Sequence, residues 1–242
     1  MIREIIHKTF PVFRSHIVCS LVLIIMCGSL SELQAQNYNF SFSQSQQAYN
    51  CLASGTYALP KGQNWTQRNI HTSIGFHFSY NGGSYDSICL KLEGQVSFDG
   101  TLQNCISLGR DLRYKADTAG NFSYIRYQTI GSIGQRIFML EFSKIGMESD
   151  PREYINVQLW LYEQAGEIEL HYGPNSYAVA KDSSSMIVVG ALSFQQTAPQ
   201  NGYLIYGNPS HAQGATMSAP NSFHFLTGIP ANGTVYTLTS VQ

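Results

Sequence analysis

Hydrophobic and polar residues alternate along much of the chain, most clearly in residues 156–174, NVQLWLYEQAGEIELHYGP. Successive side chains of a β-strand point to opposite faces, so strict alternation predicts strands with one apolar and one polar face. Two such runs flank residues 163–166. The segment therefore predicts a β-hairpin in which one face belongs to a hydrophobic core and the other does not.

The length of the turn sets which residues of this hairpin are neighbours. A four-residue loop keeps the apolar residues opposite one another, as Leu161 with Ile168, Leu159 with Leu170, and Val157 with Tyr172. The same register aligns the polar face, as Tyr162 with Glu167, Trp160 with Glu169, and Gln158 with His171. A three-residue loop would set Leu161 opposite Glu169 and mix the faces, so we reject it. Gly166 supplies the positive φ that such loops often need.

The polar face of the hairpin has two interpretations. It carries six residues that form a contiguous strip: Gln158, Trp160, Tyr162, Glu167, Glu169 and His171. The strip is either an outer sheet face with ordinary cross-strand pairs or a platform for a ligand. Aromatic rings can stack on the C–H surface of a sugar, while amides and carboxylates accept hydrogen bonds from its hydroxyls. The platform would lose its anchor if Trp160 were buried beneath another element.

Further alternating runs, separated by Gly, Asn and Pro, extend the pattern along the chain. We expect strands at residues 74–80, 87–98, 122–130, 135–142, 185–194, 203–206 and 234–240. No segment shows a convincing helical period. Short strands at regular spacing predict an all-β fold, an antiparallel two-sheet β-sandwich, jelly-roll-like, with about ten to twelve strands. Residues 36–47, rich in Asn, Ser and Gln, are either a flexible lead or an edge strand.

The N-terminal segment predicts a secretion signal. Arg3, Lys8 and Arg14 form a basic region, and residues 17–30 are apolar but shorter than the roughly 20 residues of a membrane span. Small or neutral residues favour cleavage after Ala35, with an uncleaved anchor as the alternative. We expect residues 1–35 to be a signal peptide and residues 36–242 a single domain. The protein would then be exported to the periplasm, the cell surface or the medium, with no membrane span after cleavage.

Charge narrows the class of partner. Residues 1–35 hold three of the 14 Lys and Arg and two of the 15 Asp and Glu, so the remainder has a formal charge of −2. A nearly neutral chain without a basic stripe argues against nucleic acid and anionic membranes as partners.

Three cysteines follow the predicted signal: Cys51, Cys89 and Cys105. Export favours disulfides. Alternation places Cys89 on a polar face, and a bridge between Cys89 and Cys105 is the candidate if their strands are adjacent. Cys51 would then be buried, or would pair in place of one of them, and spacing alone does not decide. The spacing of cysteines and histidines predicts no structural zinc, and we expect no bound metal.

Catalytic motifs are few. Glu167 and Glu169 share a face, and paired carboxylates perform glycoside hydrolysis. A general acid needs a raised pKa, however, and a solvent-facing strip offers little to raise one. No HExxH or GxSxG motif is present in the sequence. We therefore expect no catalytic activity and no cofactor, with a glycoside hydrolase using Glu167 and Glu169 as the alternative.

Several stretches together resemble a known module. IGFHFSYNGGSYDSICLKLEGQVSF, QRIFMLEF, the central hairpin and PANGTVYTLT are similar to the β-sandwich module of secreted and surface proteins of Bacteroidota, often found N-terminal to a type IX sorting domain. The hairpin is also distantly similar to nidogen-like domains. The resemblance covers residues 57–239 and implies an exported module without catalytic residues.

These observations favour an exported binding or adhesion module, with a glycan or an envelope protein as its partner. A structural or assembly component of the cell envelope is a further alternative, which predicts an exposed apolar edge or patch.

Overall fold

A computed structural model describes residues 39–61, 69–91, 93–113, 123–147, 154–176, 188–195, 198–217 and 224–241. The chain divides into two units, residues 1–36 and 37–242, and every described residue lies in the second. The predicted signal, residues 1–35, lies outside the described residues. No helix in these described ranges is both long and apolar enough to span a membrane.

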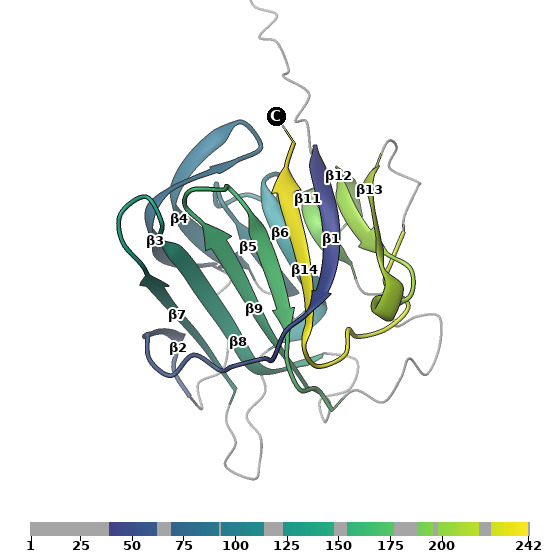
Figure 1. The fold of residues 1–242 in the computed structure, drawn as a ribbon, viewed down its shortest axis with the longest axis horizontal. Coiled ribbons are helices and arrows are strands. Elements are labelled where there is room, and N and C mark those ends of the chain that lie inside the picture. Colours follow the sequence, from purple (N-terminus) through teal and green to yellow (C-terminus); the bar gives the residue numbers. More distant parts are fainter. Residues whose placement is uncertain are drawn as a thin grey trace, which may run out of the picture. The chain divides into compact units, whose positions relative to one another are not determined.

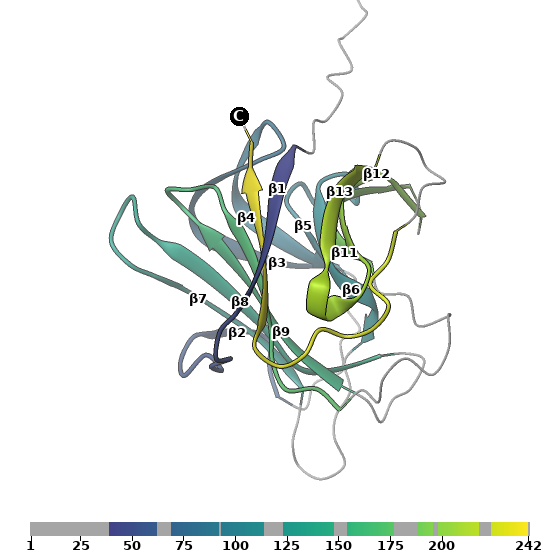
Figure 2. The same cartoon turned by 45° about the vertical axis from the view of Figure 1, so that its right-hand side comes forward.

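The described residues form fourteen strands in two antiparallel sheets of seven that pack face to face (Figures 1 and 2). Sheet 1 has, in spatial order, β1 Phe40–Gln46, β14 Thr234–Ser240, β10 Ile168–Tyr172, β9 Tyr154–Tyr162, β8 Ile137–Met147, β7 Tyr124–Ile130 and β2 Thr56–Leu59. Sheet 2 has β3 Asn69–Tyr80, β4 Gly83–Lys91, β5 Glu93–Ser97, β6 Cys105–Arg113, β11 Val189–Gln195, β12 Ala198–Tyr206 and β13 Gln213–Met217. A short pairing of β6 with β8 joins the sheets, and the 3-10 helix η1 spans Pro209–His211.

The predicted sandwich is confirmed, but its strand number is higher than expected. Residues 87–98 are not one strand, because the chain reverses direction and sets Lys91 opposite Gln95. Gly94, with φ 86°, lies in this reversal. Short strands such as β2 and β13 add to the number, since they have too few residues to show an alternating pattern. Residues 40–46 form an edge strand, β1, which pairs with β14 over seven residues.

The register of the central hairpin is as predicted. Leu161 lies opposite Ile168, Leu159 opposite Leu170, and Gln158 opposite His171. The Tyr162 amide donates to the Glu167 carbonyl at 3.0 Å, and Gly166 has φ 60°. The six apolar residues of the hairpin are all buried in the core: Val157, Leu159, Leu161, Ile168, Leu170 and Tyr172. Burial of one such side chain contributes about 1.5–3 kcal/mol, so the apolar face fixes the register.

The candidate disulfide between Cys89 and Cys105 is wrong. Strand β5 lies between their strands, and Ser97 is the cross-strand neighbour of both cysteines. Two strand spacings separate their Cα atoms by about 9.5 Å, beyond the roughly 7 Å that a disulfide spans. Both thiols are free and buried, so the expectation of an exposed Cys89 is also wrong, whereas Cys51 is free and exposed. Burial raises the pKa of Cys89 and of Cys105.

Candidate functional site: the outer face of sheet 1

The outer face of sheet 1 carries polar side chains in rows that cross the strands. Antiparallel pairing places Arg126, Glu141, Gln158 and His171 side by side on β7, β8, β9 and β10, and we name these four residues the covered row. Two further rows lie nearer the hairpin turn, and we name them the open rows. One contains Trp160, Glu169 and Thr237, and the other contains Tyr162, Glu167 and Thr239.

The covered row lies beneath residues 47–52, which we name the strap. Figure 1 shows the chain leaving β1 and crossing sheet 1 toward β2. Gln158 Nε2 donates to the Asn50 carbonyl at 2.8 Å, and the Leu52 amide donates to Glu141 Oε1 at 3.2 Å. The strap therefore uses the polar side chains of the sheet to satisfy its own backbone, as buried polar groups require.

Glu141 is the centre of the covered row. Its carboxylate is fully buried, and Arg126 lies 3.0 Å from Oε2. Gln158 Nε2 donates to Oε1 at 3.0 Å, and the Tyr49 hydroxyl donates to the same oxygen at 3.3 Å. Burial, with the charge of Glu141 beside it, raises the pKa of Tyr49 far above its usual value, so this hydroxyl remains a donor. A buried carboxylate that is paired and hydrogen-bonded in this way holds structure together.

Glu169 is the most strongly bound residue of the open rows. The Tyr162 hydroxyl donates to its Oε2 at 2.6 Å, and His171 Nε2 lies 2.7 Å from the same oxygen. Thr237 approaches Oε1 at 3.5 Å. Burial alone would raise the pKa of Glu169, but the hydrogen bonds from His171 and Tyr162 outweigh it, and its pKa lies below the usual value. Glu169 is therefore an ionised acceptor at neutral pH.

Trp160 joins the two regions. Its indole Nε1 donates to Gln158 Oε1 at 2.8 Å, and its ring stacks on His171 with 4.0 Å between centroids. Trp160 is nevertheless partly exposed, as are Tyr162 and Glu167. The covered row thus fixes the orientation of an aromatic ring that still reaches solvent.

The structure divides the six predicted strip residues into two groups. Gln158 and His171 are 1% and 4% exposed, so the expectation that they lie on an accessible strip is wrong. The strap and Trp160 cover them. Trp160, Tyr162, Glu167 and Glu169 remain partly exposed and adjacent. Their role in ligand binding stays a prediction.

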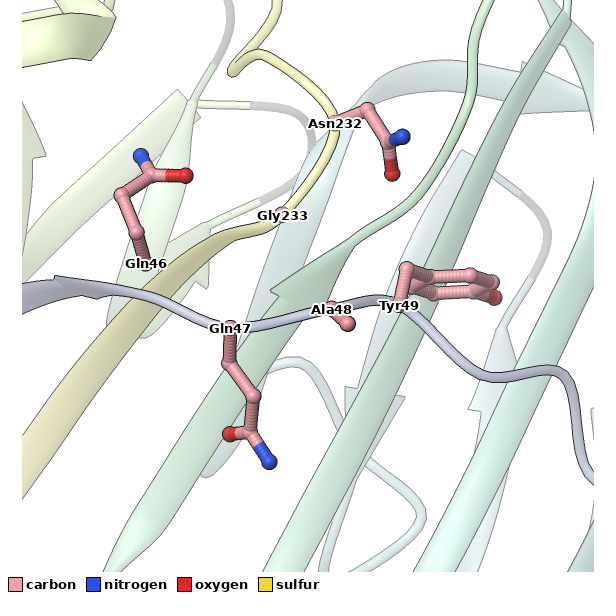
Figure 3. Close-up of a pocket in the computed structure, with 6 residues that line it drawn as sticks. All are labelled: Gln46, Gln47, Ala48, Tyr49, Asn232 and Gly233. Carbon is pink, nitrogen blue, oxygen red and sulfur yellow. The ribbon is translucent and has the colours of Figure 1, made fainter.

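A pocket lies where the strap leaves β1. It has a volume of about 300 Å³ and opens to solvent. Figure 3 shows its lining from the end of β1, the strap and the loop before β14: Gln46, Gln47, Ala48, Tyr49, Asn232 and Gly233. No lining residue carries a formal charge, so the pocket offers amide groups and one aromatic ring.

Comparison with family models identifies the family of this chain. A family model described as NIDO related matches residues 39–240, which include both sheets and the whole candidate site. The chain belongs to the NIDO-related family. The nidogen-like part of the predicted resemblance is thereby confirmed, whereas the association with Bacteroidota surface proteins and type IX sorting stays a prediction. Searches of the curated proteins and of the solved structures gave no match.

Membership of the NIDO-related family bears on the predicted activity. Such domains are typically extracellular and are a non-enzymatic type of module. Glu169 has a lowered pKa, which is unfavourable for a general acid near neutral pH, and Glu167 accepts a hydrogen bond from Thr239 at 3.1 Å. In the part of the chain that the structure describes, no cluster of His, Cys, Asp or Glu could hold a metal ion.

Glu141, Arg126 and Tyr49 belong to this NIDO-related site but were not predicted from the sequence. Glu141 stands alone between apolar residues in the run MLEF, and that is the signal by which it could have been found. Its partners come from a neighbouring strand and from the strap, 15 and 92 residues away in sequence. No local pattern reveals such pairings.

Proposed function

We propose that this NIDO-related protein is an exported extracellular module that binds neutral glycan chains through the open rows. The observation that carries the proposal is the juxtaposition of Trp160 and Tyr162 with Glu167, Glu169 and two threonine hydroxyls on a partly exposed sheet face. The aromatic rings offer surface to sugar C–H groups, and the carboxylates accept hydrogen bonds from sugar hydroxyls.

The charge of this surface favours a neutral glycan over an acidic one. Glu167 and Glu169 are both acidic, and two described arginines, Arg126 on β7 and Arg136 beside β8, are already paired. Arg126 lies 3.0 Å from Glu141, and Arg136 pairs with Glu163 at 2.5 Å. An acidic glycan would meet the like charge of both glutamates, which is unfavourable.

A glycan array with the purified protein, followed by titration of the best neutral hit, tests the proposal. The decisive variant is Trp160→Ala, because it removes the aromatic ring that the covered row orients. Tyr206→Ala is the matched control. Tyr206 is a partly exposed aromatic residue of sheet 2 whose ring lies tilted against His224, with 4.6 Å between centroids.

We expect Trp160→Ala to weaken binding at least about tenfold while the variant remains folded, and Tyr206→Ala to bind like the wild type. Neutral glycans should bind in preference to sialylated or sulfated ones. Equal binding by wild type and Trp160→Ala, or a preference for acidic glycans, would contradict the proposal.

A protein partner is the second candidate, favoured by an apolar turn at the end of sheet 1. Ile133, in the connection between β7 and β8, is 88% exposed, and Ile130, the last residue of β7, is 44% exposed. This turn is held by Glu163, whose Oε2 accepts from the Gly134 amide at 2.8 Å and the Arg136 amide at 3.1 Å. A rigid turn with exposed isoleucines fits an apolar contact.

Sedimentation analysis distinguishes this second candidate. If the turn mediates self-assembly, the wild type should form oligomers with rising concentration and Ile133→Ser should not. A strictly monomeric wild type at high concentration would remove self-assembly from consideration and leave the glycan proposal untouched.

A further inference from the structure

We propose that the amide-lined pocket of Figure 3 is a second contact for the same ligand, which is therefore a linear neutral oligosaccharide of several residues. This inference rests on the proposed glycan binding and goes beyond it, because it assigns a site and a chain length. The pocket lies outside the open rows, and Tyr49 is the lining residue that also helps to hold the strap on Glu141.

The chemistry of the lining matches hydroxyl groups. Gln47 and Asn232 are exposed, and their amides have no hydrogen-bond partner among the described residues. Each amide has a donor and an acceptor, and each sugar hydroxyl is also both. A volume of about 300 Å³ lies at the lower limit of typical ligand pockets and suits one small polar group of a larger ligand.

Gly233 keeps the pocket open. It has φ 91°, and a Cβ at this position would lie 3.0 Å from the Gln47 carbonyl oxygen and 3.2 Å from Gln46 Oε1. Figure 3 shows the Gln46 and Asn232 side chains to either side of Gly233. Because Gly233 has no side chain, Gln46 Oε1 lies beside the free space as an acceptor. The Nε2 of Gln46 already donates to Thr234.

The backbone of the pocket favours a sugar over a peptide. A peptide that adds to a sheet edge needs free main-chain donors and acceptors. Here the Gln47 backbone N–H donates to the Gly233 carbonyl at 2.8 Å, and the Gly233 backbone N–H donates to the Tyr172 carbonyl at 2.9 Å. With these groups already paired, recognition falls to the side-chain amides and the Tyr49 ring.

One part of the pocket, the Tyr49 ring, lies on the same face of sheet 1 as the open rows. The Tyr49 ring packs over Gly173, where an added Cβ would lie 2.7 Å from ring carbons. Gly173 follows Glu169 by four residues, which is about 13 Å along an extended chain. Ala48, the smallest side chain of the pocket lining, lies in the strap beside Tyr49. A linear ligand can therefore contact both sites, whereas a single sugar residue cannot reach from one to the other.

The experiment is a calorimetric titration with cello-, malto- and chito-oligosaccharides of one to six residues. The test variant is the double substitution Gln47→Ala with Asn232→Ala. Gln164→Ala is the matched control, because Gln164 is an exposed amide in the turn between β9 and β10. A neutral peptide, (Gly-Ser)4, is titrated in parallel.

At least one series should show affinity that rises about tenfold or more between the shortest binding member and the hexamer. The double variant should lose this increase and keep its affinity for the shortest binding member, and Gln164→Ala should behave like the wild type.

Affinity that is independent of length, or an increase that survives the double variant, would overturn the pocket assignment and leave the open-row proposal standing. Binding of the peptide that the double variant abolishes would replace the sugar with a peptide and also overturn it. If none of the three series binds the folded wild type, both proposals are overturned. If Trp160→Ala binds as tightly as the wild type, only the open-row proposal is overturned.

Discussion

The covered row and the open rows lie on the same sheet face, one cross-strand pair apart, yet their polar side chains differ in burial and in the groups that they bind. Glu141 and Gln158 are buried and bind the strap, whereas Tyr162 and Glu167 are partly exposed. Both regions arise from the same alternation of polar and apolar residues along the strands. The difference between them therefore follows from what lies above each region. A polar residue at an outward position becomes structural when another segment uses it to satisfy its backbone, and remains available when none does.

The largest effect should come from Glu141→Ala. Removing the carboxylate leaves Arg126 without its ion-pair partner and the Leu52 amide without its acceptor. Loss of one partner of a buried pair costs about 3–5 kcal/mol of unfolding free energy. Urea denaturation measures this, and Glu167→Ala is the matched control from the open rows. A loss below about 1 kcal/mol for Glu141→Ala would show that the strap does not depend on this residue.

Gln158→Leu should have the next largest effect, because Gln158 binds both the strap and Trp160. The substitution removes the donor to Asn50 and the acceptor of the Trp160 indole. Unsatisfied buried groups cost about 1–3 kcal/mol, and the fluorescence of Trp160 should change with its loss of orientation. Gln164→Leu should change neither. An unaltered fluorescence spectrum for Gln158→Leu would show that the covered row does not orient Trp160.

Gly166→Ala should destabilise the hairpin by about 1–2 kcal/mol, since an L-residue is strained in the left-handed conformation. Gly166 has φ 60°, and an added Cβ would contact nothing within 4 Å, so backbone strain is the whole expected cost. Gly166→Asn should cost less, because Asn tolerates this conformation. Equal stability of Gly166→Ala and wild type in urea would argue against this turn geometry.

The smallest effect concerns the pH dependence that Glu169 contributes. Its pKa is lowered in the folded state, so the ionised form contributes stability above the usual glutamate pKa of about 4.3. That stability is lost as the pH falls through the folded-state pKa. The difference in thermal stability between wild type and Glu169→Gln should therefore be largest at pH 7 and should shrink as the pH falls below about 4.3. A constant difference across this range would mean that the carboxylate contributes nothing through ionisation.

Local alternation was sufficient to predict the hairpin register, because a shift of one residue would have exposed Leu159 and Leu170. It could not predict the burial of Gln158 or His171, since the strap that covers them comes from residues more than 100 positions earlier. The burial of Cys105 likewise depends on residues that are distant in the sequence. It packs on the outer face of sheet 2 in a second apolar cluster with Val188, Leu192, Leu204 and Met217.

The reversal of direction between β4 and β5 shows a different limit. Residues 87–98 keep the apolar period on both sides of the reversal, because Ile88, Leu90, Val96 and Phe98 all reach the core. A period of two does not distinguish one long strand from two short ones when a single glycine allows the turn. The covered and open rows were likewise indistinguishable in sequence.

The central claim is that the open rows are free for recognition while the covered row maintains the fold, and Glu167→Ala tests it most directly. Glu167 is partly exposed, and its carboxylate accepts a hydrogen bond from Thr239. Titration of the best-bound neutral oligosaccharide into this variant should show affinity at least about fivefold weaker than wild type, with unfolding free energy changed by less than about 0.5 kcal/mol. Unchanged affinity, or a loss of stability as large as that of Glu141→Ala, would contradict the division of this face into two functions.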